Sequence, residues 1–284
     1  MAYEEQYQQS LSSKYECLLF DLDDTLYPYS SGLSLEVTKN IQEYMIQKLN
    51  IEETEVTEMC ISLYKNYGTT MAGLRAVGYD FDYDDFHGFV HGRLPYDMLL
   101  KPDPVLRNLL LSVPLRKLIF TNADSAHAAR VLKRLGLEDC FDGIICFETL
   151  NDTKQQSDSG EDRASDIEMN TDSGNAPVDD RMLPSTPVVC KPFDRAFEEV
   201  FKMAKIHPQK TLFFDDSFRN LQTGSRMGLH TVLVGTSHRI EGADHALENI
   251  HNIREAFPEL WEDNEKCEGV TYSEKVPIET PVRA

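Results

Sequence analysis

The carboxylates best placed to do chemistry in this sequence follow its first apolar run. Residues 18–28 read LLFDLDDTLYP, so Asp21, Asp23 and Asp24 stand close together and Thr25 follows at once. The apolar run predicts a strand buried on both faces of a parallel sheet, and ligands bind at the carboxyl ends of such strands. Carboxylates crowded there repel one another unless they share a proton or a cation. The cluster therefore favours a divalent metal site over its alternative, a solvated acidic turn.

Three later stretches place polar residues at positions of the same kind. RKLIFTNAD predicts a strand that ends on Thr121 and Asn122, and TLFFDDS predicts a strand that ends on Asp215 and Asp216. Lys191 comes just before a segment with helical periodicity. Each alone has an ordinary explanation: a surface charge, a strand-end hydroxyl, or a cap for the next helix. Their joint occurrence is better explained by one catalytic site.

Apolar strands alternate with helical segments between these stretches. A segment with Val131, Leu132 and Leu135 on one face predicts a helix that ends at Gly136, and FDGIICF (141–147) predicts the next strand. The pattern continues with a helix that starts at Pro192, a strand at 211–217, a helix that runs to Met227 and a strand from His230. The alternation is typical of an α/β fold, and we expect a doubly wound, Rossmann-like parallel sheet.

Residues 34–112 interrupt this alternation with an almost wholly helical pattern. One stretch repeats apolar residues at helical spacing, which predicts one packed face of a helix; its members are Val56, Met59, Cys60, Leu63, Tyr64 and Tyr67. Ile41, Met45 and Leu49 form a similar stripe. Such stripes indicate packing between helices rather than a cofactor site. We therefore expect a helical module inserted after the first strand.

These patterns divide the chain into an α/β core, an inserted cap and three polar segments. The core is expected at 15–30 and 103–261, and the helical cap at 31–102. Residues 151–187 are rich in Ser, Asp, Asn and Thr and almost free of large apolar side chains, so they predict a disordered acidic insert with a spacer or regulatory role. A disordered N-terminus at 1–14 and a flexible tail at 262–284 complete the division.

The composition narrows the possible partners. The 284 residues carry 28 Lys and Arg against 48 Asp and Glu, a formal net charge of −20, which argues against a nucleic-acid polymer or an anionic membrane as partner. No apolar stretch approaches the ~18 residues of a membrane span. The polar N-terminus is unlike a signal peptide, and six scattered cysteines without a CxxC pair favour buried free thiols. We expect a cytoplasmic protein, with the nucleus as another possible compartment; the oligomeric state stays open.

The four polar stretches resemble the motifs of haloacid dehalogenase superfamily phosphohydrolases. That family carries DxDx[TV], a strand-terminal Thr or Ser, a Lys before a helix, and a strand-terminal acid pair. The corresponding stretches here are DLDDT, FTN, CKPF and FFDDS, in the same order. The resemblance covers roughly residues 15–260 apart from the polar insert, and it implies a Rossmann-like core with a helical cap.

The resemblance implies roles for three catalytic residues. Asp21 is the expected nucleophile, which forms an aspartyl-phosphate and so divides hydrolysis into two displacements. Asp23 is expected to protonate the leaving oxygen and then activate water, for which its carboxyl needs a raised pKa. A phosphate ester needs such an acid and a halide does not, so Asp23 favours a phosphatase over a dehalogenase. Lys191 is expected to place its charge against the transferring group.

The resemblance also implies a Mg²⁺ ion and contacts to the phosphate. The metal is expected on the Asp21 carboxylate, the main-chain carbonyl of Asp23 and the Asp215 carboxylate, with Asp216 orienting Lys191 or a water on the metal. Substrate contacts are expected from residues near the strand ends, namely Thr25, Thr121, Asn122 and Lys191. Asp24 is as readily a solvated or capping acid as a functional one.

Stretches of the expected cap and of the adjoining core resemble the fungal and plant pyrimidine 5′-nucleotidase branch. The resemblance rests on YKNYGTTMAGLRA, HGRLPYDMLLKPDP and FTNADSAHAARVLKRLGLEDCFDGII. It implies removal of the 5′-phosphate from UMP-like or CMP-like nucleotides, with Arg75 among the candidate contacts to the base or ribose, beside Tyr67, Thr69 and Thr70. Other small metabolites (FMN, pyridoxal phosphate, a sugar phosphate), a phosphomutase and a non-catalytic regulatory protein are the alternatives.

Overall fold

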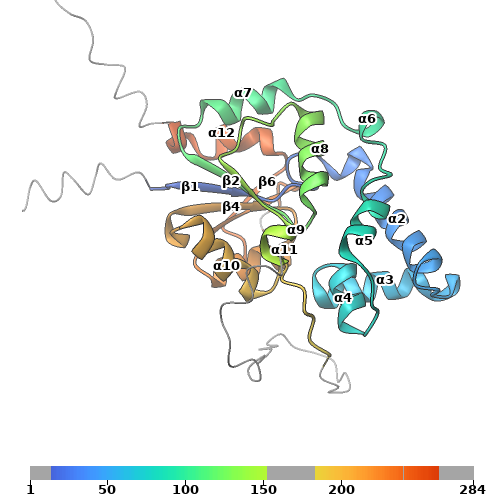
Figure 1. Ribbon diagram of the computed structural model, residues 1–284. Helices are drawn as coiled ribbons and strands as arrows, with labels where there is room; N and C mark the ends of the chain where they lie inside the picture. Colours follow the sequence, from blue (N-terminus) through green and yellow to red (C-terminus); the bar gives the residue numbers. More distant parts are fainter. Residues whose placement is uncertain (1–13, 152–182, 239, 262–284) are drawn as a thin grey trace, which may run out of the picture.

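The computed structural model describes residues 14–151, 183–238 and 240–261 (Figure 1). The described part of the chain forms a six-stranded parallel sheet in the order β3-β2-β1-β4-β5-β6. The strands are β1 (Cys17–Phe20), β2 (Arg116–Phe120), β3 (Gly143–Ile145), β4 (Thr211–Asp215), β5 (His230–Val234) and β6 (His245–Leu247). The predicted doubly wound α/β fold is confirmed.

The centre of the sheet brings the strand ends of the predicted site together. All residues of β1 are buried, and Phe20 pairs with Ile119 of β2 on one side and with Phe214 of β4 on the other. The residues that follow these strands therefore emerge side by side at one edge. Because the sheet is buried on both faces, its strands are continuous apolar runs, which is why the sequence pattern identified them.

Helices cover both faces of the sheet (Figure 1). Leu18 and Phe20 belong to the same buried cluster as residues of α7 (Pro104–Ser112), α8 (Ser125–Leu135) and α12 (Ile253–Ala256). Cys17 and Leu19 belong to a second cluster with α10 (Asp194–Ala204) and α11 (Phe218–Arg226). Successive strand residues thus serve opposite faces. Short α9 (Phe147–Asn151) follows β3, and one-turn 3-10 helices lie at Tyr29–Ser31, Pro208–Lys210, Ile250–Asn252 and Pro258–Trp261.

A separate group of helices lies beside the carboxyl ends of the strands (Figure 1). It consists of α2 (Leu33–Gln47), α3 (Glu53–Tyr67), α4 (Thr70–Ala76) and α5 (Tyr83–Val90). The expected cap at 31–102 also contains α6 (Tyr96–Leu99), but α6 packs against α8 and its Tyr96 belongs to the core cluster. Residues of α2 to α5 share a third hydrophobic cluster of their own. We call this group the cap. None of the helices in the described ranges combines the length and apolar character needed to cross a bilayer.

The boundaries of several elements differ from those expected from the sequence. Pro192 is not the first residue of a helix; Phe193 is the N-cap of α10, which begins at Asp194. Tyr64 does not pack with the rest of its stripe on α3, because its side chain is half exposed and stacks with the guanidinium of Arg219. The five cysteines of the described ranges are buried free thiols, as expected.

The expected disorder at 1–13, 152–182 and 262–284 lies outside the described residues. The two ends of the acidic insert are described. Asn151 ends α9, and its side-chain amide exchanges two hydrogen bonds with the main chain of Val189, at 2.8 and 3.0 Å. The hydroxyl of Thr186 donates to the carbonyl of Ala72 in the cap at 2.7 Å. The structured part of the chain therefore extends from the core into both borders of the segment.

Candidate active site

A buried lysine joins the ends of β1 and β4. Lys191 Nζ donates to Asp21 Oδ1 at 2.7 Å, to Asp215 Oδ2 at 2.8 Å and to the main-chain carbonyl of Phe120 at 2.7 Å. Lys191 is 1% exposed and Asp215 is fully buried. A buried ammonium is stable only with such partners, and the two carboxylates hold the pKa of Lys191 above its usual range although burial alone would lower it. The first, third and fourth sequence motifs thus meet at one point.

The main chain of Lys191 is held by the second motif and by the cap. Asn122 accepts a hydrogen bond from the Lys191 amide at 2.9 Å and donates to its carbonyl at 3.1 Å. Gly68, at the end of α3, lies so close that an added Cβ would stand 2.2 Å from the Lys191 carbonyl oxygen. Asn122 was expected at the phosphate, but its amide engages Lys191 instead. It therefore positions the lysine.

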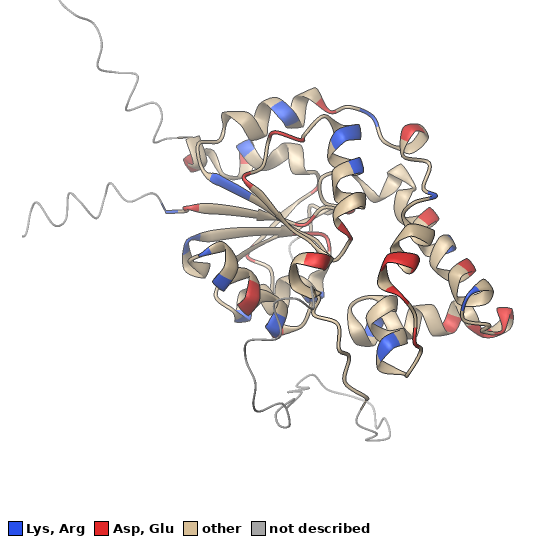
Figure 2. Cartoon of the chain, viewed as in Figure 1, with Lys and Arg blue, Asp and Glu red and all other residues tan. Residues whose placement is uncertain are grey.

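Three carboxylates crowd around this lysine. Oxygens of Asp21, Asp215 and Asp216 lie within 4.8 Å of one another. Burial and the neighbouring charge of Asp215 raise the pKa of Asp21 to about 7 although Lys191 opposes the shift. Desolvation and the charges of Asp21 and Asp215 raise the pKa of Asp216 to about 9. A single ammonium does not neutralise this cluster. Acidic segments of the chain lie at the strand ends (Figure 2).

The donor set at this cluster fits a hard divalent cation. It offers carboxylate oxygens alone, which is the ligand type that Mg²⁺ prefers. The Asp215 carboxylate is fixed by the amide of Ser217 at 2.8 Å and by the side chain of Asn220 at 3.0 and 3.1 Å, so its orientation does not depend on a metal. Asp21 Oδ2 accepts from the Thr25 hydroxyl at 3.1 Å. Thr25 was expected to contact substrate, and in the structure it orients Asp21.

The Asp23 carboxylate contacts two residues that the sequence analysis did not identify. Its Oδ1 accepts from the Tyr27 hydroxyl at 2.6 Å and lies 2.7 Å from His127 Nε2. Burial alone would raise the pKa of Asp23, but His127 and Tyr27 lower it to about 2. The expected raised pKa is therefore wrong, because a buried cationic partner outweighs the negative neighbours.

His127 is the protonated member of this pair. It is 1% exposed and lies in the first turn of α8, three residues after the N-cap Asp124. Although burial acts to lower it, Asp23 raises the pKa of His127 above the usual value. Its Nδ1 lies 2.8 Å from the Tyr96 hydroxyl, which itself donates to the His91 carbonyl at 3.1 Å. Tyr96 thus accepts from Nδ1, which suits an imidazolium that donates from both nitrogens.

The remaining expected site residues lie at different distances from the cluster. Thr121 is buried after β2, and its hydroxyl accepts from the amide of Ala123 at 3.0 Å. Asp24 adopts φ 59° and accepts from Ser34 of the cap at 2.7 Å, while burial raises its pKa to about 6. Arg75, which was expected to contact the base or ribose, lies apart from the other expected site residues. Its guanidinium binds Asp80 and the Tyr79 carbonyl and stacks on Phe81 and Tyr83, all within the cap.

Comparisons with known proteins agree with this fold. No protein-family model matches the chain. Over 239 residues it is 27% identical to Phosphate metabolism protein 8 of Saccharomyces cerevisiae, which covers 81% of this chain and 64% of the relative. The chain therefore spans less than two thirds of the length of the curated relative that it matches.

Solved structures give the fold. A haloacid dehalogenase superfamily phosphatase from Thermococcus onnurineus matches with a TM-score of 0.50 at 16% identity, over 85% of this chain and 97% of that one. The hydrolase YfnB from Bacillus subtilis matches with a TM-score of 0.48 at 17% identity, over 86% and 98%.

The parallel sheet, the cap inserted after β1 and the acidic cluster at the strand ends define a capped α/β fold. The four motifs meet in this site in the order and at the strand ends that one superfamily uses. The chain has the fold of a haloacid dehalogenase superfamily phosphatase, and its four motifs resemble those of that superfamily.

Proposed function

We propose that this chain is a Mg²⁺-dependent phosphomonoesterase that works through an aspartyl-phosphate. The observation that carries the proposal is the buried contact of Lys191 with both Asp21 and Asp215, at 2.7 and 2.8 Å. This contact orients the Asp21 carboxylate and partly screens its charge. The carboxylate also belongs to the acidic cluster that suits a divalent cation. The phosphatase matched in fold and the yeast relative, named for phosphate metabolism, support this assignment.

The chain's own residues divide the work of the first displacement. Asp21 attacks phosphorus with a carboxylate oxygen and the ester oxygen departs in line. Lys191 offsets the negative charge that the nucleophile and the phosphoryl group bring together, and Thr25 fixes the second oxygen of Asp21. Asp215 and Asp216, with Asp21 and the main-chain carbonyl of Asp23, would hold Mg²⁺, which neutralises phosphate charge when bound. Thr121 and the amides that begin α8 are the candidates to bind the other phosphate oxygens.

Proton transfer falls to the Asp23–His127 pair. The pair carries a proton at neutral pH because Asp23 holds the pKa of His127 up while His127 holds that of Asp23 down. The leaving oxygen takes this proton through Asp23, which then accepts one from the water that hydrolyses the aspartyl-phosphate. The low pKa of Asp23 alone does not prevent this, because the proton is stored on the imidazole.

The proposed substrate is a small phosphorylated metabolite, in first place a pyrimidine nucleoside 5′-monophosphate. The cap contacts the loop that carries Lys191 through Gly68, and Ser34 of the cap contacts Asp24 beside the nucleophile. A cap this close to the phosphate site favours small substrates over phosphoproteins and nucleic-acid polymers. The proposal for the base rests on the resemblance of the cap sequence. Arg75 would contact the base or ribose only if its contacts within the cap change.

The experiment is phosphate release from a panel of phosphoesters by the full chain, with Mg²⁺ and with EDTA. The panel holds UMP, CMP, AMP, FMN, pyridoxal phosphate and a sugar phosphate, with Asp21→Asn beside the wild type. Mg²⁺-dependent turnover of UMP and CMP that is lost in the variant supports the whole proposal. Turnover of another ester keeps the mechanism and rejects the nucleotide, and dependence on a bisphosphate activator identifies a mutase. A folded wild type without turnover rejects the catalytic role.

A further inference from the structure

A cavity of about 220 Å³ lies between the cap and the core, and His127, the partner of Asp23, is among the residues that line it. Its walls come from α5 of the cap and from the start of α8 in the core. The lining side chains are rich in metal-binding groups and include His87, His91, Asp124, His127 and Glu148. No role in the proposed phosphatase chemistry uses His87, His91 or Asp124.

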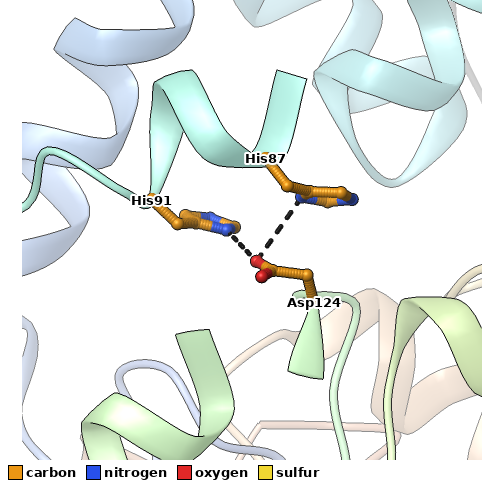
Figure 3. Close-up of side chains that lie close together, drawn as sticks. All are labelled: His87, His91 and Asp124. Carbon is orange, nitrogen blue, oxygen red and sulfur yellow. Dashed lines mark hydrogen bonds and ion pairs between the residues drawn. The ribbon is translucent and has the colours of Figure 1, made fainter. Parts of the chain in front are cut away.

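His87 of α5 and His91, the C-cap residue of that helix, face one carboxylate of the core (Figure 3). His87 and His91 are four residues apart, so they lie on one helix face, and their rings stack with centroids 5.5 Å apart. Asp124 Oδ1 lies 3.5 Å from His87 Nδ1 and is hydrogen-bonded to His91 Nδ1. The other oxygen, Oδ2, caps α8 by accepting from the amide of His127 at 3.2 Å. Oδ1 is therefore the oxygen available to the histidines.

His87 is buried without a partner. Its residue is 7% exposed, and neither ring nitrogen has a hydrogen-bond partner among the described residues. A buried imidazole without hydrogen-bond partners loses its hydration without compensation. A buried imidazole that has no hydrogen-bond partner and lies beside a carboxylate can coordinate a metal ion through a ring nitrogen.

We propose that His87, His91 and Asp124 bind one transition-metal ion, with Zn²⁺ as the leading candidate. Two imidazole nitrogens and one carboxylate oxygen form a ligand set used by Zn²⁺ and by related ions of the first transition row. Two ligands about 2.1 Å from a tetrahedral ion are about 3.4 Å apart, which matches the 3.5 Å between His87 and Asp124. The three ligand atoms already lie within 4.8 Å of one another.

Binding replaces a proton by the metal. His91 Nδ1 now donates a hydrogen bond to the Asp124 carboxylate. The ion takes its place between Nδ1 and Oδ1, the proton leaves to solvent, and His87 provides the third bond. The cavity leaves room for water at a fourth position. This site differs in chemistry from the all-oxygen cluster of Asp21, Asp215 and Asp216, so Mg²⁺ is a poor competitor for it.

The ion would join the cap to the core. Two ligands belong to α5 of the cap and the third precedes α8 of the core. A metal bond across this boundary fixes α5 against α8, and the His91 ring lies 4.3 Å from that of His127, centroid to centroid. The ion would therefore hold the cap against the core next to the Asp23–His127 pair.

The test is metal binding by the full chain after EDTA treatment, in excess Mg²⁺. Zn²⁺ affinity is measured by competition with a chromophoric chelator, and the site is observed directly through the visible d–d bands of Co²⁺. We expect one ion per chain in the wild type. His87→Gln and His91→Gln should weaken binding by more than the about 10–100-fold that loss of a second-shell partner costs. His207→Gln, which removes an exposed histidine beside Glu16, and Asp216→Asn should leave it unchanged.

Folding is controlled by a variant that keeps the helix cap. Asn at position 124 still caps α8 but removes the ligand charge, so Asp124→Asn should fold and bind weakly. Zn²⁺ should raise the melting temperature of the wild type and of His207→Gln, and not that of Asp124→Asn. Failure of the wild type to bind, equal binding by His87→Gln, or a thiolate-to-Co²⁺ charge-transfer band would overturn the proposal. None of these outcomes depends on phosphatase activity.

Discussion

Replacement of Lys191 by methionine should destabilise the protein strongly and in a pH-dependent way. The substitution keeps the length of the side chain and removes three hydrogen bonds of 2.7–2.8 Å to Asp21, Asp215 and Phe120. Removal of one partner from a buried ion pair typically costs about 3–5 kcal/mol, because the other charge stays buried. At about 2–4 °C per kcal/mol for a protein of this size, the melting temperature should fall by about 6–20 °C.

The pH dependence follows from Asp21. Its pKa is already raised to about 7 by burial and by Asp215 against the effect of Lys191. Without the lysine, that pKa rises further above the unfolded value of 3.8. A group with a raised folded pKa loses stability as pH increases through that pKa. The deficit of Lys191→Met should therefore be larger at pH 8 than at pH 5, where Asp21 is neutral in both proteins.

The assay is urea unfolding of the full chain in EDTA at both pH values, followed by addition of Mg²⁺ at pH 8. Lys117→Met is the matched control, because Lys117 is also buried but its Nζ donates only to the carbonyls of Val113 and Leu115 at 2.9 Å. The control should lose the same stability at both pH values. A Lys191→Met deficit below about 1 kcal/mol, or one that does not change with pH, would refute the assignment of Lys191 as the charge that holds two carboxylates together.

Two further variants probe the supports of the site. Gly68→Ala should lower both the melting temperature and the rate of phosphate release, because φ is +81° and the new Cβ would stand 2.2 Å from the Lys191 carbonyl oxygen. The control is Gly78→Ala, where φ is +96° and nothing lies within 4 Å of the new Cβ, so it should lose only the about 1–2 kcal/mol of stability that a left-handed conformation costs. Equal losses of stability in the two variants would contradict the role of the close contact. His127→Gln should raise the pKa of Asp23 from about 2, since burial then acts without its cationic partner, and should lower kcat; an unchanged carboxyl titration by NMR in EDTA would argue against the pair.

The sequence predicted the sheet and the carboxylate cluster because both have local signatures. A strand buried on two faces must be apolar throughout, and a phosphate site at its end places acids directly after that run, as at Asp21 and Asp215. The order of the strands makes these ends neighbours. Motifs that are distant in the chain therefore met as expected.

The partners of Asp23 had no comparable signature. His127 lies on an ordinary helix face, and its contact with Asp23 spans 104 positions of the chain. Only the fold shows that this imidazole is buried against the carboxylate, and this reverses the expected direction of the pKa shift. The pair His87 and His91 did have a signal, the spacing of four on a helix, but the third member, Asp124, comes from another element. Cap-to-core contacts of this kind depend on tertiary packing rather than on periodicity.

The reciprocal hydrogen bonds between Asn151 and Val189 join the two parts of the chain that form the two halves of the sheet. Residues up to 151 contribute β3, β2 and β1, whereas residues from 183 onward contribute β4, β5 and β6. The seam between the two halves of the sheet runs between β1 and β4, so Asp21 stands on one side of it and Lys191 and Asp215 on the other. A chain opened within 152–182 would thus yield two fragments that each hold half of a catalytic centre. Their reassociation would restore it, which makes this fold a natural candidate for a complementation reporter.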